Sequence, residues 1–79
     1  MKRTEILERL TGVFRKIFND DLLTLHNELT ANDVESWDSL THMLLVEEIE
    51  NTFSIKFRLK DLNKMRNVGD MIDIIADKL

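Results

Sequence analysis

The residues with the clearest chemical potential are Asp38, Ser39 and Leu40, at the middle of a 79-residue chain. A strong helical pattern starts at Ser39, and Asp38 can cap that helix because a carboxylate accepts hydrogen bonds from the free amides of the first turn. Ser39 then occupies the first helical position, above the positive end of the helix dipole. A phosphate ester on its hydroxyl would be stabilised by the same amides and dipole. The sequence therefore predicts a covalent, phosphate-bearing site at Ser39.

His42 lies one turn after Ser39, so a catalytic triad that also includes Asp38 is an alternative. A triad needs a base bonded to the nucleophile, an orienting acid and an oxyanion site, and a chain of this size has little room for a substrate cleft. We therefore interpret His42 as a hydrogen-bonded, semi-buried side chain at the mouth of the helix bundle and expect no catalytic residue. A metal site is not expected either, because two histidines without cysteine make a poor zinc site and the acidic stretch before Trp37 lacks the glycine of a calcium-binding loop.

Length and composition favour one small all-α domain spanning residues 1–79. Hydrophobic residues make up 43% of the chain, which contains two glycines and no proline, and this composition favours helices. The absence of cysteine excludes disulfides and thiolate metal sites. The first residues contain no long apolar run, so we expect neither a signal peptide nor a membrane span. By default we expect a cytoplasmic location.

Acidic residues are concentrated around Ser39. Residues 20–55 contain nine Asp and Glu residues and no Lys or Arg, whereas the whole chain has a formal charge of −4. Such a field repels nucleic acid and attracts basic protein surfaces, so a nucleic-acid partner is not expected. An acidic surface that is merely solvated is the alternative interpretation.

The elements that would position Ser39 are predicted from hydrophobic spacing of three and four residues. The predicted helices are Thr4–Phe18, Ser39–Phe53, a short one at Leu59–Met65, and a last one capped by Asn67. Between the first two lies an irregular connection at 19–37, which is long enough to be functional or to pack as a loop of its own. We therefore predict a small four-helix bundle, with three main helices and one short helix, and a long loop between the first and second.

The helix predicted at 39–53 carries two apolar arcs when its residues are placed at about 100° per residue. The arc that must face the core consists of Leu45, Val46, Ile49 and Phe53. The second arc consists of Leu40, Met43 and Leu44, and it is interleaved with the carboxylates of Glu47 and Glu50. A bundle helix has one core face, so we expect the second arc to be partly exposed and to bind partner proteins, with Leu40 the most covered of its apolar side chains. The alternative is that this arc packs under the long loop.

Asp38-Ser39-Leu40 at the start of an acidic amphipathic helix, near the middle of a small chain, resembles the acyl carrier protein family. The resemblance extends over nearly all of the chain, since the flanking helical segments fall where that family has them. In the family this serine receives a 4′-phosphopantetheine arm, which holds an acyl or aminoacyl group as a thioester. The resemblance implies that Ser39, preceded by Asp38, is the attachment point. It also implies that a separate phosphopantetheinyl transferase attaches the arm and that the chain is not an enzyme.

The resemblance further implies partners and an interior for the acyl group. The helix at 39–53 would be recognised by acyl-transferring or acyl-activating enzymes with basic surfaces, and the chain would act as a monomer. The residues assigned to the acyl pocket are His42, Leu45, Val46 and Ile49. Carriers of fatty acid synthesis usually have acids two and five residues after the serine, where this chain has Thr41 and Leu44. A polyketide, peptide or saccharide-modifying pathway therefore competes with fatty acid synthesis as the setting.

A rival hypothesis from another class is an unmodified helical interaction module that binds a partner helix through Leu40, Met43 and Leu44. A small enzyme is the third and least supported hypothesis. The intact mass after expression beside a phosphopantetheinyl transferase discriminates between a carrier and the other two.

Overall fold

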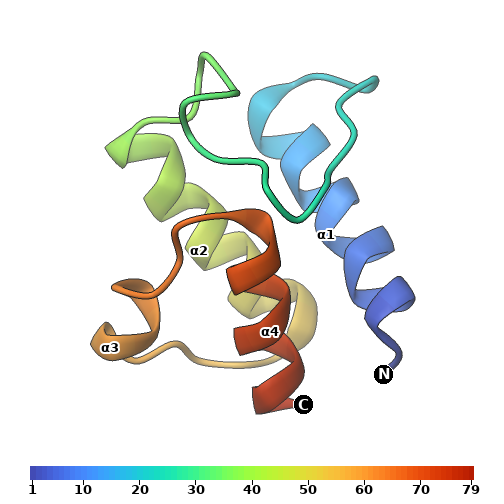
Figure 1. The fold of residues 1–79 in the computed structure, drawn as a ribbon, viewed down its shortest axis with the longest axis vertical. Helices are drawn as coiled ribbons and strands as arrows, with labels where there is room; N and C mark the ends of the chain where they lie inside the picture. The colour runs from blue at the N-terminus through green and yellow to red at the C-terminus, as the bar shows by residue number, and fades with distance from the viewer.

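The computed structural model describes residues 1–79 and contains four helices and no strand (Figure 1). The helices are α1 (Arg3–Phe18), α2 (Ser39–Phe53), α3 (Leu59–Leu62) and α4 (Val68–Lys78). This confirms the predicted all-α bundle of three main helices and one short helix, with the long loop between α1 and α2. The short helix ends at Leu62, earlier than predicted, and the chain continues in turns to α4. None of the helices combines the length and hydropathy that a membrane span requires.

The three main helices pack around one apolar core, in which α1 contacts both α2 and α4. The largest side chains that are fully buried are Phe14, Ile6, Leu10, Leu45, Ile49, Met71, Ile72, Ile75 and Val68. They recur at three- and four-residue spacing, which places them on one face of each helix. Phe14 lies against a second aromatic ring, that of Trp37, in an edge-on arrangement with 5.2 Å between ring centroids. Trp37 precedes α2 by two residues, so this contact connects the core to the start of that helix.

The loop at 19–38 is held against α4 before it reaches α2 (Figure 1). The amides of Val68 and Gly69 donate to the carbonyl oxygens of Leu29 and Asn27, at 3.0 and 2.9 Å. The first turn of a helix has amides without partners inside the helix, and here the loop supplies two acceptors. The Asn67 side chain accepts a third bond, from the amide of residue 70 at 2.8 Å, and confirms the predicted cap. The loop is therefore part of the bundle, and its path to Ser39 is fixed.

An ion pair attaches the short helix α3 to the end of α4. Lys78 Nζ lies 2.8 Å from Asp61 Oδ2, and both side chains are largely shielded from solvent. The Asp61 carboxylate also accepts from the amide of Arg58, at 2.8 Å. The hydrogen bond from Lys78 holds the pKa of Asp61 below its ordinary value. Because one face of α3 is fixed in this way, its other face points away from the core.

The two glycines of the chain give a matched test of the loop contact. Gly12 is exposed and a Cβ there would meet no atom within 4 Å, so Gly12→Ala should raise the free energy of unfolding by about 0.5–1 kcal/mol. A Cβ on Gly69 would lie 3.2 Å from both the Cβ and the carbonyl oxygen of Asn27. Gly69→Ala should therefore displace the loop and lower the free energy of unfolding. Urea denaturation measures the free energy of unfolding of both variants. If both substitutions stabilise the chain equally, the loop accommodates a Cβ at residue 69 without loss of stability.

Candidate functional site at the amino terminus of α2

Asp38 caps α2 through two reciprocal hydrogen bonds. Its Oδ1 atom accepts from the amide of Thr41 at 2.9 Å, and its own amide donates to the Thr41 hydroxyl at 2.8 Å. The Thr41 hydroxyl in turn donates to the carbonyl oxygen of Ser36, at 2.8 Å. The bond from the Thr41 amide holds the pKa of Asp38 below its ordinary value. The predicted cap is thus confirmed, and Thr41 completes a capping box with it.

Ser39 is the first residue of α2 and is exposed. An open hollow of about 500 Å³ lies beside it. The residues that line this hollow are Ala31, Trp37, Asp38, Ser39, His42 and Met43. Its walls therefore combine an exposed hydroxyl with apolar side chains and one imidazole. The start of α2 thus combines a modifiable hydroxyl with an adjacent surface on which a flexible substituent can lie.

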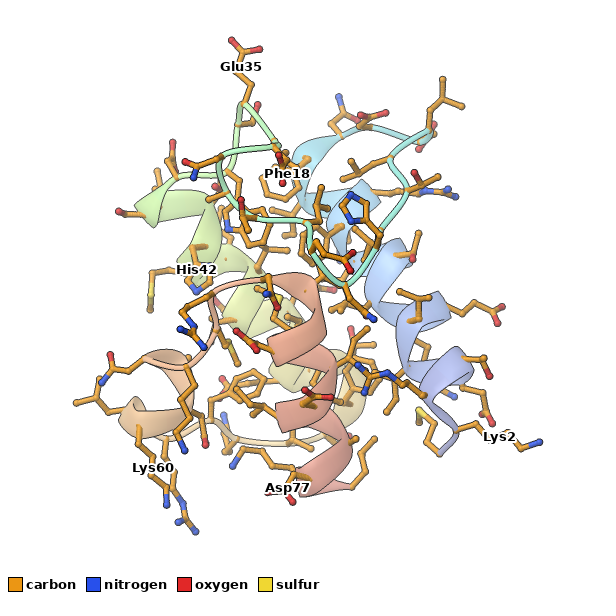
Figure 2. All side chains as sticks on the ribbon, in the orientation of Figure 1. Lys2, Phe18, Glu35, His42, Lys60 and Asp77 are labelled. Atoms are coloured by element: carbon orange, nitrogen blue, oxygen red, sulfur yellow. The ribbon has the colours of Figure 1, made fainter.

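Trp37 and His42 form one wall of the hollow. The two rings are stacked, with 6.1 Å between centroids and an angle of 11° between planes, and Trp37 Nε1 donates to His42 Nδ1 at 3.1 Å. His42 projects from the end of the first turn of α2 and is half-buried, as predicted (Figure 2). Since Nδ1 accepts this bond, a neutral His42 carries its proton on Nε2. Burial lowers the pKa of His42 below its ordinary value.

These contacts give no support to the alternative of a catalytic triad. A base in such a triad must use its free nitrogen to accept the proton of the serine. Here His42 Nδ1 accepts from Trp37 and the Asp38 carboxylate accepts from the amide of Thr41. Asp38 and His42 therefore fix the start of α2 and one wall of the hollow.

Only one of the residues assigned to the acyl pocket lines the hollow. His42 does, whereas Leu45, Val46 and Ile49 are buried at 0%, 6% and 0% exposure and lie elsewhere on α2. Leu45 and Ile49 belong to the packed core. Their place in an acyl pocket stays a prediction, and it requires the core to open between the helices.

The second arc of α2 is exposed, so it does not pack under the loop. Leu40, Met43 and Leu44 are 72%, 57% and 46% exposed. The expectation that Leu40 is the most covered of the three is wrong, since it is the most exposed. The reason is that the end of the loop turns inward at Trp37, whose ring packs on Phe14, and leaves the first turn of α2 uncovered.

The carboxylates that follow Ser39 on α2 differ in their surroundings. Glu47 is exposed. Glu50 is half-buried and accepts from the amide of Phe57 at 2.8 Å, so the expectation that it lies freely on the exposed arc is corrected. Glu48 lies 2.8 Å from Lys16 Nζ and ties α2 to α1. Of the three, Glu47 is thus the carboxylate available to a partner.

Comparison with solved structures finds a solution NMR structure of the holo acyl carrier protein from Geobacter metallireducens. The two chains are 46% identical and superpose with a TM-score of 0.87, over 91% of this chain and 83% of the other. The chain belongs to the acyl carrier protein family. No protein-family model matches it, and no curated protein matches it.

Two features of this acyl carrier protein site could not be found from sequence patterns. Ala31 reaches the hollow from the irregular loop, where no periodicity indicates which side chains turn inward. Trp37 was assigned no role at the site from the sequence, although an aromatic residue five positions before His42 is a usable signal for a ring contact. Both depend on the path of the loop, which the amino terminus of α4 determines.

Acidification should weaken the Trp37–His42 contact of this acyl carrier protein. A protonated imidazole cannot accept from the indole, and the folded pKa of His42 lies below the ordinary 6.5, so the unfolded chain takes up the proton first. The stabilisation that neutral His42 gives the folded chain is complete above pH 6.5, and it is lost as the pH falls from 6.5 toward the folded pKa. Because Trp37 is the only tryptophan, urea unfolding followed by its fluorescence at about pH 7.5 and 5.5 measures the loss.

The control is a pair of histidine variants. His42→Gln keeps an acceptor for the indole but does not titrate, so its stability should change less between the two pH values. His26→Gln, at an exposed position outside the hollow, leaves the Trp37–His42 contact in place and should still lose stability between the two pH values. If the parent and His42→Gln lose the same stability, groups other than His42 cause the change.

Proposed function

We propose that this chain carries an acyl or aminoacyl group as a thioester on a 4′-phosphopantetheine arm attached to Ser39. It delivers the group to partner enzymes of fatty acid, polyketide or related biosynthesis, and residues 1–79 act as one carrier domain. The observation that carries the proposal is the exposed Ser39, directly after Asp38, the residue that caps α2. The 46% identity to a holo acyl carrier protein supports it. In that family the protein carries the group, and separate enzymes transform it.

The surroundings of Ser39 fit a phosphodiester. α2 is a helix of 15 residues, and its amino-terminal amides and dipole stabilise a negative group at its first position. The Asp38 carboxylate adds an opposing negative charge, but its bond to the amide of Thr41 directs it into the cap. An arm on Ser39 would lie along the hollow, whose volume of about 500 Å³ is in the range of small-molecule sites. There Trp37 and Met43 offer apolar contact and His42 a polar one.

The surroundings of α2 also fit enzymes with basic surfaces. Leu40, Met43 and Leu44 are exposed beside Ser39 and are suited to apolar pockets, while Glu47 is suited to a partner cation. Thr41 and Leu44 make the region nearest Ser39 less acidic than in carriers of general fatty acid synthesis, which favours a specialised pathway. With this function we expect a cytoplasmic monomer.

The modification is tested by mass. Incubation with coenzyme A and a phosphopantetheinyl transferase of broad specificity should add one phosphopantetheine to the parent chain. Ser39→Ala should abolish the addition and leave the helical circular dichroism unchanged, because the side chain is exposed. Ser36→Ala, three residues earlier in the loop, should still accept the arm. Modification that persists in Ser39→Ala would overturn the assignment, and no modification of the parent chain would favour the unmodified interaction module.

The partner surface is tested by the rate of that reaction at several salt concentrations. Glu47→Lys should slow association, most strongly at low salt, because a charge at the rim of an interface acts mainly on encounter. Leu44→Glu should weaken docking with less dependence on salt and should change the free energy of unfolding by about 0.5 kcal/mol or less. Glu8→Lys, an equal charge reversal on the exposed side of α1, is the control and should leave the rate unchanged. If Leu44→Glu unfolds the chain, Leu44 belongs to the core and the docking surface lies elsewhere.

A further inference from the structure

A second charged surface, of opposite sign, lies on residues 56–66, which we call the basic segment. It contains five bases and one acid, a formal charge of +4 in a chain whose total is −4. The bases are Lys56, Arg58, Lys60, Lys64 and Arg66. The rest of the chain is therefore strongly acidic, and the basic segment is the exception to the acidity around Ser39.

Most of these bases have no carboxylate partner within the chain. All five are exposed, and only Arg66 forms an ion pair, with 3.6 Å between its Nε atom and Asp70 Oδ2. The acid of the segment, Asp61, is paired instead with Lys78 of α4, at 2.8 Å. Four exposed cations thus lie close together in sequence and form no ion pair, and such like charges repel one another unless a partner of opposite charge binds.

An apolar side chain lies among these cations. Leu59, the first residue of α3, is 75% exposed. The opposite side of the segment is fixed, because Met65 is buried and Asp61 is bound to Lys78. Figure 2 shows Lys60, the next residue, at the outer edge of the molecule. An exposed leucine flanked in sequence by Arg58 and Lys60, on a fixed support, has the arrangement of an interface anchor with a charged rim.

We propose that the basic segment docks an acidic surface of a partner protein, with Leu59 in an apolar pocket and the unpaired cations facing carboxylates. Charge complementarity favours this partner over the basic enzymes proposed to bind at α2. An anionic membrane is disfavoured, because one leucine on a four-residue helix offers little area to bury and the acidic residues 20–55 would be repelled by the headgroups. The inference goes beyond the carrier function and does not depend on Ser39.

The test is photo-crosslinking in the organism of origin, with p-benzoylphenylalanine in place of Leu59 in the full chain. Mass spectrometry then identifies the crosslinked peptide. The proposal expects a peptide from another protein, on a surface with an excess of Asp and Glu. A crosslink to lipid, to a second copy of this chain or to a basic surface would overturn it, and so would the absence of any crosslink.

Charge reversals with the purified partner complete the test. Lys60→Glu with Lys64→Glu should weaken binding by about tenfold, and replacing the contacting partner acids by lysine should restore it. Lys2→Glu with Arg9→Glu gives the same net charge at two exposed positions at the start of the chain and on α1, and should leave binding within about twofold of the parent. Equal weakening by both pairs would show that only net charge matters and would overturn the docking site. The mass measurement at Ser39 tests the carrier function separately.

Discussion

The edge-on contact between Trp37 and Phe14 fixes the position of the start of α2 against α1. Phe14 is a fully buried residue of α1, and Trp37 ends the long loop two residues before Ser39. The indole therefore fixes the backbone at the point where Asp38 must adopt its extended conformation to cap the helix. The position of the serine hydroxyl thus depends on a hydrophobic contact in another part of the chain. Loss of this contact would disturb the cap and one wall of the hollow together.

Polar contacts also hold the loop between α1 and α2 in place. Its carbonyl groups at Asn27 and Leu29 accept from the first amides of α4, which would otherwise need water as a partner. At its beginning, Arg15 Nε donates to the carbonyl oxygen of Leu23 at 2.8 Å. A connection that lacks regular secondary structure is therefore held by α1 and α4 before it delivers Trp37 to the core.

Periodicity predicted the helices, because a helix buried on one face has apolar residues at three- and four-residue spacing. The caps at Asp38 and Asn67 were predictable as well, since each depends on neighbours in sequence. The exposure of Leu40 and the hydrogen bond from the Phe57 amide to Glu50 could not be predicted, because both depend on the path of a connecting segment. The bond from Trp37 to His42 has the same cause: the residues are close in sequence, but the loop sets the orientation of the indole.

The separation of the acidic residues 20–55 from the basic segment gives the molecule a permanent electric dipole moment. In the field of a charged partner, such a dipole experiences a torque that turns the protein before the surfaces touch. The molecule measures 28 × 25 × 22 Å, whereas the Debye length at physiological ionic strength is about 8 Å. The torque therefore acts only in the last stage of approach, when the partner is already closer than the width of the protein. A basic enzyme and an acidic partner would turn the same molecule in opposite directions, so each would meet it in its own orientation.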